Sequence, residues 1–265
     1  MELSYDTFYQ GHKQLHFVQT AWDFGKGGNP GIENSLYPTG PTIMQHFPEQ
    51  VESATVINSW WPVEFKHGER IYNGKDFLVA DSLFFQTMGI PLLEGNAKDL
   101  GMRNVIFMSQ SFAREVFGNE NPVGKTLLWN GKEQAIVKGI YADIPENNTF
   151  RGKAVLSMAS LDFRKDWFSG GSVSSVVRLK EGADMDFINE RINPILANYI
   201  PMEEHYTKLA KAKGIKVSLT PMDGYHLSFS KVRTMLYILS LLGYVLLISA
   251  AYNYALISIY SLGHR

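Results

Sequence analysis

The chain has 265 residues, enough for one large domain or two modest ones, and its 45% hydrophobic content supports a substantial core. Its 25 basic and 26 acidic residues nearly cancel, so bulk charge gives no reason to expect nucleic-acid binding. The absence of cysteine excludes disulfides and thiolate metal sites.

The first part of the chain predicts a β-α-β unit. Residues 15–24 favour a strand, and a Gly/Asn/Pro-rich loop follows at 25–40. Residues 41–53 predict a short helix that begins at a proline and breaks or restarts at Pro48. A second strand is expected over 54–65, which completes the unit.

The middle of the chain predicts short elements joined by tight turns. Asn73-Gly74 indicates a hairpin over 71–79, and Asp81 can cap a helical turn that ends at Gly89. The remaining elements expected here are an extended segment at 90–95, a strand at 104–109, a helix at 109–117 with a serine cap and Gly118 at its end, and a hairpin through Asn130-Gly131 that runs to Ile144 before Pro145.

After Thr149 the pattern of the first part returns. Strands are expected at 154–161 and 172–182, then an amphipathic helix at 184–200 capped by Asp184, and a closing strand at 214–222. This is a second β-α-β unit. The fold class predicted from the sequence is therefore α+β, with two β-α-β units that frame an insertion at roughly 66–146.

Residues 234–263 contain no charged side chain and predict a transmembrane helix. A bilayer core needs about 20 apolar residues in a helix, and this segment is longer. Tyr237 and Tyr260 lie near its two ends, where interfacial aromatic side chains belong. Because residues 1–13 have no signal-peptide pattern, we expect a membrane helix upstream of this chain, which would then be a piece of a larger protein.

The stretch FGNENPVGKT, residues 117–126, resembles a phosphate-binding P-loop, but its spacing is wrong. Five residues separate Gly118 from Gly124, where a P-loop has four, and Pro122 removes a backbone donor. The flanking order is helix, loop, strand, the reverse of what a P-loop requires. We therefore expect Gly124 to permit a turn, Lys125 to be solvated, and no nucleotide to bind.

The polar side chains give no catalytic, cofactor-binding or metal site. Glu203, Glu204 and His205 lie in a polar run typical of a solvated turn, and His12 and His16 are poorly placed to share a metal. No nucleophile motif such as G-x-S-x-G occurs. Three aspartates beside turns or helix starts are explained by capping or turn-making: Asp81, Asp143 and Asp223.

Two aromatic motifs indicate contacts. Trp60 and Trp61 would face opposite sides of the predicted strand, so one should pack in the core while the other could mark a partner surface. In Tyr252-Asn253-Tyr254, an amide inside the membrane segment would bond to another helix.

Four segments in order carry a resemblance to a known family: Val79–Gly95, Val105–Gly118, Pro122–Lys125 and Val137–Pro145. They resemble the periplasmic core domain of MacB/FtsX-type ABC transporter permeases. Asn96 departs mildly from the arginine frequent at that place. The opening ELSYDTFY resembles the start of Bacteroidetes-type members after their first membrane helix, and residues 251–265 resemble the second membrane helix and its end.

The resemblance implies a domain between the first and second of four membrane helices. It would have a porter-like lobe made of two β-α-β units, 1–65 and 147–226, with an inserted Sabre-like mixed α/β lobe at 66–146. A stalk and transmembrane helix would follow at 227–265, with the stalk-to-membrane transition at 227–240. Residues 1–230 would be mostly periplasmic, at the bacterial inner membrane.

The resemblance also implies a mechanical function and no enzyme activity in this chain. ATP would bind a separate cytoplasmic ABC ATPase, whose closure moves the membrane helices and, through them, the outer domain. Further expected partners are a second permease copy, envelope or outer-membrane proteins, and membrane lipid. The alternative is an extracytoplasmic sensing domain of a membrane receptor such as a histidine kinase. A hydrolase of the envelope would need a clustered acid–base or metal site.

Overall fold

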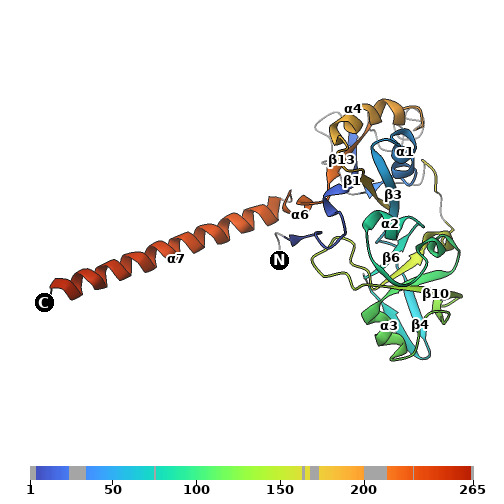
Figure 1. The fold of residues 1–265 in the computed structure, drawn as a ribbon, viewed down its shortest axis with the longest axis horizontal. Coiled ribbons are helices and arrows are strands. Elements are labelled where there is room, and N and C mark those ends of the chain that lie inside the picture. Colours follow the sequence, from blue (N-terminus) through green and yellow to red (C-terminus); the bar gives the residue numbers. More distant parts are fainter. Residues whose placement is uncertain are drawn as a thin grey trace. The chain divides into compact units, whose positions relative to one another are not determined.

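The computed structural model describes residues 4–23, 34–74, 76–162, 165–167, 173–199, 214–228 and 230–263. The chain divides into two compact units: a domain of helices and strands, Leu3–Asp223, and a helical unit, Gly224–Arg265 (Figure 1).

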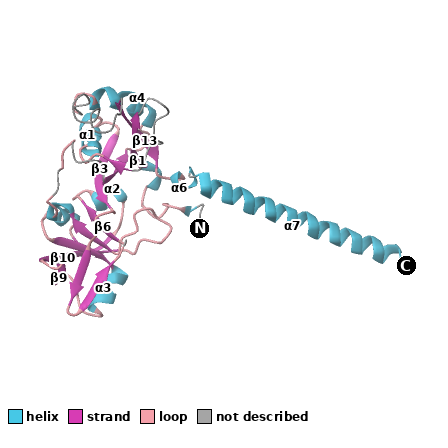
Figure 2. Ribbon diagram, turned by 180° about the vertical axis from the view of Figure 1, so that it is seen from behind, coloured by secondary structure: helices cyan, strands magenta, loops and turns pink. Residues whose placement is uncertain are grey.

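One mixed sheet of thirteen strands runs through the described part of the domain (Figure 2). The order along its main path is β13 (Gly214–Pro221), β1 (Leu15–Asp23), β12 (Val173–Leu179), β3 (Val51–Asn58), β6 (Phe77–Ala80), β11 (Ala154–Ser157), β8 (Val105–Ser109), β10 (Glu133–Tyr141), β9 (Thr126–Trp129), β4 (Glu64–His67) and β5 (Arg70–Asn73). Two short strands lie off this path: β2 (Asn34–Ser35) pairs with β12, and β7 (Leu92–Gly95) pairs with β10. The α+β class is confirmed.

The two predicted β-α-β units are present and interleaved. β1 and β3, joined through α1 (Thr39–His46), run parallel with β12 between them. β12 and β13, joined through α4 (Met185–Leu196), run parallel with β1 between them. This is the split β-α-β arrangement, in which each unit supplies the strand that the other needs as a neighbour.

α1 and α4 pack against this part of the sheet and form one hydrophobic core. Ile188, Ile192 and Leu196 recur every four residues along α4, so they share a face and are buried against the sheet. Asp184 begins the helix by accepting hydrogen bonds from the amides of Asp186 (2.9 Å) and Phe187 (3.2 Å), as predicted.

A second core surrounds α3 (Gln110–Phe117), next to β8 and β10. The Ser109 hydroxyl accepts a hydrogen bond from the Phe112 amide, and Gly118 ends the helix, as the sequence predicts. The other short helices are α2 (Phe84–Met88), η2 (His12–Gln14), η3 (Ala97–Gly101) and η4 (Met158–Ser160). The lobe boundaries at 65, 146 and 226 stay a prediction.

The predicted hairpin over 71–79 is wrong. β5 pairs with β4 through a two-residue turn at Gly68-Glu69, in which Gly68 has a φ of 58°. β6 leaves this ribbon and lies between β3 and β11 instead. Its four residues are all buried, so it gains more from a central place in the sheet than from pairing with the exposed β5.

The break predicted at Pro48 is confirmed, but the strand after it begins and ends earlier than expected. α1 ends at His46 because Pro48 disfavours helical geometry at Phe47, and β3 already begins at Val51. β3 ends at Asn58, whose side chain accepts hydrogen bonds from the amides of Trp60 (3.0 Å) and Trp61 (2.8 Å). The tryptophans therefore lie in a bend and not in a strand, and neither packs in the core: they are 71% and 40% exposed.

The helical unit consists of α6 (Tyr225–Ser228) and the 34-residue α7 (Ser230–Gly263). α7 is one uninterrupted helix, drawn in orange to red in Figure 1. Thr234–Tyr260 is long and apolar enough to cross a membrane, with a mean hydropathy of 2.0 in its most apolar window and none of that window buried. This candidate span coincides with the segment that the sequence predicted.

Candidate functional site

The two connections that lead out of the domain sheet leave it side by side. β1 starts at Leu15 and β13 ends at Pro221, and the ladder between these strands pairs His16 with Pro221. The Met222 amide extends the ladder by donating to the Leu15 carbonyl (2.9 Å). From Met222 the chain continues toward α6 and α7. The N-terminal segment and the membrane-helix connection thus attach to neighbouring backbones.

The N-terminal segment is fixed to the loop after β10 by Asp6. Only 2% of Asp6 is exposed, and its carboxylate accepts hydrogen bonds from the Thr149 amide (2.6 Å) and hydroxyl (2.7 Å). Its own amide donates to the Asn147 carbonyl (3.0 Å). The Tyr9 hydroxyl donates to the Phe150 carbonyl (3.2 Å). Two segments about 140 residues apart in the sequence therefore form one polar contact.

Arg178 fixes the same segment to the sheet. It is buried in β12, and its guanidinium donates to the carbonyls of Thr87 and Gln10, both at 2.7 Å, and to the Gln14 side chain at 3.1 Å. All of these acceptors are neutral. Burial lowers the pKa of Arg178, and the more distant charge of Glu52 opposes that shift. Arg178 joins β12, the end of α2 and the N-terminal segment.

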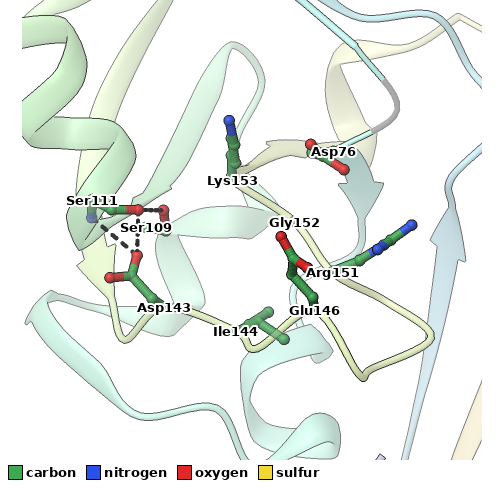
Figure 3. Close-up of a pocket in the computed structure, with 9 residues that line it drawn as sticks. All are labelled: Asp76, Ser109, Ser111, Asp143, Ile144, Glu146, Arg151, Gly152 and Lys153. Atoms are coloured by element: carbon green, nitrogen blue, oxygen red, sulfur yellow. Dashed lines mark hydrogen bonds between the residues drawn. The ribbon is translucent and has the colours of Figure 1, made fainter. Parts of the chain in front are cut away.

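A surface cleft of about 400 Å³ lies at the N-terminal end of α3 (Figure 3). On one side of it Ser109, Ser111 and Asp143 are hydrogen-bonded to one another. Charged side chains of both signs complete the lining: Asp76, Glu146, Arg151 and Lys153.

The hydrogen bonds in this cleft form a helix cap. The Asp143 carboxylate accepts from the Ser111 amide (3.0 Å) and hydroxyl (2.7 Å), which satisfies a free donor of the first turn of α3. No histidine lines the cleft among the described residues. Asp143 therefore has the capping function that the sequence predicted.

Asp81 fixes the turn that leads into α2 from a half-buried position. Its carboxylate accepts from the Thr55 hydroxyl (2.7 Å) and from the amides of Val56 (2.9 Å) and Leu83 (3.0 Å). Burial raises the pKa of Asp81, and these hydrogen bonds only partly oppose that rise. At Asp143, partial burial also raises the pKa, but the hydrogen bonds from Ser111 and Ser109 outweigh it and leave the pKa lowered.

These two carboxyl groups should affect stability in opposite pH ranges. The pKa of an aspartate in an unfolded chain is about 3.9. The stabilising contribution of Asp81 is complete below that value and is lost as pH rises through its raised pKa, whereas that of Asp143 is present above it and is lost as pH falls through its lowered pKa. The free energy of unfolding should be measured in urea as a function of pH. In Asp81→Asn the loss of stability at rising pH should disappear, and in Asp143→Asn the loss at falling pH should disappear. Carboxyl NMR titrations that place both groups on the same side of 3.9 would contradict the assignment.

The remaining predicted residues lie apart from this cleft. His12 and His16 line one groove, discussed below, but the described residues contain no cluster of three side chains suited to a metal. Glu203, Glu204 and His205 lie outside the described residues. Asp223 is exposed in the turn before α6. Tyr252 and Tyr254 are exposed on α7.

The loop that resembled a P-loop joins α3 to β9, as predicted. Gly124 has a φ of 87°, which is consistent with its expected turn. Lys125 is partly exposed, and its ammonium group pairs with Glu120 and lies 5.2 Å from the centre of the Phe117 ring. Lys125 thus closes the loop on itself and does not project toward a ligand.

The family of the MacB-like periplasmic core domain matches residues 2–195, well over half of the chain. The chain belongs to this family. It is the periplasmic domain of a MacB/FtsX-like ABC transporter permease, with one apolar helix at its C-terminal side that could span a membrane. No curated protein matches the chain.

Solved structures share the fold of this MacB-like domain. A domain assigned to a permease protein from Porphyromonas gingivalis has a TM-score of 0.65 at 20% identity and covers 80% of this chain and 92% of its own. The periplasmic region of MacB from Actinobacillus actinomycetemcomitans has a TM-score of 0.52 at 16% identity, covering 80% and 90%. The extracellular domain of the noncanonic ABC-type transporter YknZ from Gram-positive bacteria has a TM-score of 0.50 at 12% identity, covering 77% and 98%. The Porphyromonas structure fits the Bacteroidetes-type resemblance of the sequence.

Sequence reasoning missed the two side chains that hold the N-terminal segment of this MacB-like domain. Asp6 lies within the opening motif ELSYDTFY, and Arg178 is the one charged residue of the apolar strand Val173–Leu179. A charge inside an otherwise uncharged strand must be buried with partners, so the position of Arg178 was a usable signal. Asp6 gave no such signal, because its partner Thr149 is remote in the sequence.

Proposed function

We propose that this domain transmits conformational change from a cytoplasmic ATPase to the periplasm. The observation that carries the proposal is the pairing of Leu15 and His16 with the chain at Pro221 and Met222. In a permease with one membrane helix before the domain and one after it, both helices would act on adjacent strands of one sheet. A displacement of both helices would then move the sheet as a rigid body.

The helix after the domain is suited to such a function. A continuous helix of 34 residues is about 50 Å long, and its backbone hydrogen bonds are satisfied internally. It can therefore carry displacement along its axis without rearranging. The segment 227–240 would connect the periplasmic part to the bilayer, in which Asn253 would bond to another helix of the permease.

MacB-like permeases in general work with cytoplasmic ABC ATPases, and in this proposal ATP binds to such a separate subunit or domain. The chain would lie in the bacterial inner membrane with residues 1–230 mostly periplasmic. A second permease copy and envelope or outer-membrane proteins are the further partners of this proposal, and the substrate class is efflux cargo or an envelope substrate. No cofactor is assigned to this chain.

Asp6 provides a test of the coupling. In the full-length permease with its ATPase, Asp6→Ala removes both bonds to Thr149 and should weaken the attachment of the N-terminal segment by about 2–3 kcal/mol. ATP-driven distance changes between spin labels on the domain and the membrane part should then shrink, while ATP hydrolysis continues. Asp6→Asn, which keeps one acceptor and tolerates the φ of 60° at this position, should have a smaller effect.

Asp162→Ala is the matched control, because Asp162 is exposed and the partner that the described residues give its side chain is Arg103, on the surface. It should leave the distance changes unaltered. Unchanged movement in Asp6→Ala, or unchanged ATP-driven function after a covalent cross-link between the stalk and the domain, would refute mechanical transmission by this route.

A further inference from the structure

A groove of about 660 Å³ lies on the domain at the end of the sheet where β1 begins. Its walls are the segment Gly11–Gln14 and the end of β12 with the loop that follows it, Leu179–Ala183. The volume falls within the range of small-molecule sites. The groove is separate from the cleft beside α3, and no step of the mechanical proposal uses it.

The accessible charges of this groove are predominantly positive. Lys13 and Lys180 are exposed on its two walls, and Glu181 is the opposing acid of the lining. Arg178 lies behind the first wall, where its guanidinium donates to the Gln14 side chain, so its charge adds to the field without being free to bind. Lysine ammonium groups act as point donors that suit phosphate oxygens.

One buried side chain of the groove has an unused polar atom. His16 is only 7% exposed, yet it lines the groove. Its Nδ1 lies 3.0 Å from the Gln14 carbonyl oxygen and donates to it, and in the described part of the chain its Nε2 has no hydrogen-bond partner. Because the Nδ1 proton is donated to that carbonyl, Nε2 can accept a hydrogen bond or, once the ring is protonated, donate one to a ligand.

The floor of the groove is apolar. Leu179 is a member of the core beneath it, and Ala183 and Met185 are half-buried side chains packed against the same core. The groove therefore combines an apolar floor with two ammonium groups and one imidazole. A bare ion would leave the exposed parts of Ala183 and Met185 in water, whereas a molecule with an apolar body would cover them.

We propose that this groove binds a phosphate group carried on an apolar body, with Lys13, Lys180 and the Nε2 of His16 contacting the phosphate and Leu179, Ala183 and Met185 contacting the body. Two sources supply this chemistry: the headgroup of an anionic phospholipid and a soluble phosphate ester. Bound phosphate would stabilise the protonated imidazole, so binding should raise the pKa of His16, which burial otherwise lowers.

The test uses the whole chain in micelles of a neutral maltoside detergent and hexyl phosphate as the probe. Calorimetry should show saturable binding at least about tenfold tighter than that of inorganic phosphate, because the hexyl chain covers the floor. Hexyl glucoside, which lacks the charge, should not bind. The NMR titration midpoint of His16 should rise when hexyl phosphate is added.

The charge-reversed double variant Lys13→Glu/Lys180→Glu should weaken hexyl phosphate binding by at least about tenfold. Lys98→Glu/Lys132→Glu is the matched control, because it changes net charge equally at exposed lysines outside the groove. The milder double variant Lys13→Ala/Lys180→Ala is less disruptive to folding, and it should also weaken hexyl phosphate binding. Equal losses in the groove and control variants, no saturable binding, or equal binding of hexyl glucoside would each overturn the proposal.

A second arm separates the two sources. The chain is placed in nanodiscs of phosphatidylglycerol with no probe added, and the His16 resonance is compared with that in maltoside. A raised His16 midpoint in the nanodisc assigns the groove to lipid headgroups, whereas a rise only with added hexyl phosphate assigns it to a soluble ester. A midpoint unchanged in both arms refutes phosphate binding, and neither result depends on ATP-driven movement.

Discussion

Arg178→Ala is expected to lower the free energy of unfolding by about 3 kcal/mol. The substitution leaves the Thr87 and Gln10 carbonyls, now bonded at 2.7 Å, without these donors and leaves a cavity beside Gly89. The substitution also removes a buried charge whose desolvation is unfavourable. The expected loss of stability is therefore smaller than the summed free energies of the separate hydrogen bonds. Urea unfolding of the whole chain in neutral detergent measures it.

Two further variants identify the cause. Arg178→Lys keeps the charge but cannot reach three acceptors at once, so it should lose about 2 kcal/mol if the forked geometry is what matters. Arg191→Ala is the surface control: this arginine pairs with Glu190 and lies 3.9 Å from the centre of the Phe187 ring, and its removal should cost under about 1 kcal/mol. Equal losses at positions 178 and 191 would refute a structural function for the buried guanidinium.

Gly95→Ala is the second large effect, with an expected loss of about 3–4 kcal/mol. Gly95 has a φ of 99° and pairs with Gly139 where β7 meets β10. A Cβ atom there would overlap the Lys138 carbonyl oxygen and lie 2.7 Å from the Gly139 Cα. Both are backbone atoms, which cannot move without opening the β7–β10 ladder.

Gly131→Ala is the matched control for that substitution. Gly131 also has a positive φ, 68°, but a Cβ there meets no atom within 4 Å. It should therefore show only the backbone penalty, about 1–2 kcal/mol. The difference between the two variants in denaturant midpoint measures the steric contribution, and equal midpoints would show that the close approach of β7 to β10 does not limit stability.

Features set by neighbouring residues were predictable from the sequence. The serine cap and terminal glycine of α3, the Asp184 cap of α4 and the Asn130-Gly131 hairpin each depend on contacts within a few residues. The uncharged run of α7 was equally clear, because a membrane span needs only length and composition. The order of predicted strands and helices gave the α+β class, and motifs in order carried the family resemblance.

Features set by distant partners were not predictable. The turn residues Asn73-Gly74 favoured a local hairpin, but the neighbours of β6 are β3 and β11, and the latter is more than 70 residues away. Trp60 and Trp61 are β-prone, yet the side chain of Asn58 binds their amides and ends the strand. The partners of Asp6 and Arg178, Thr149 and Thr87, are related to them by no pattern in the sequence, although the place of Arg178 in an otherwise uncharged strand indicates that it is buried.

The direction of a force applied to β1 and β13 through their chain connections decides how much force the ladder between these strands can resist. Eight residue pairs hold these strands together, from His16 and Pro221 to Asp23 and Gly214, and both chain connections join at the first pair. A force that separates the two connections would unzip the ladder one rung at a time. A force that moves both connections in the same direction places no shear across the β1–β13 ladder. The bonds of Asp6, Tyr9 and Arg178 precede the first rung on the N-terminal side, so they take up a separating pull before the ladder does.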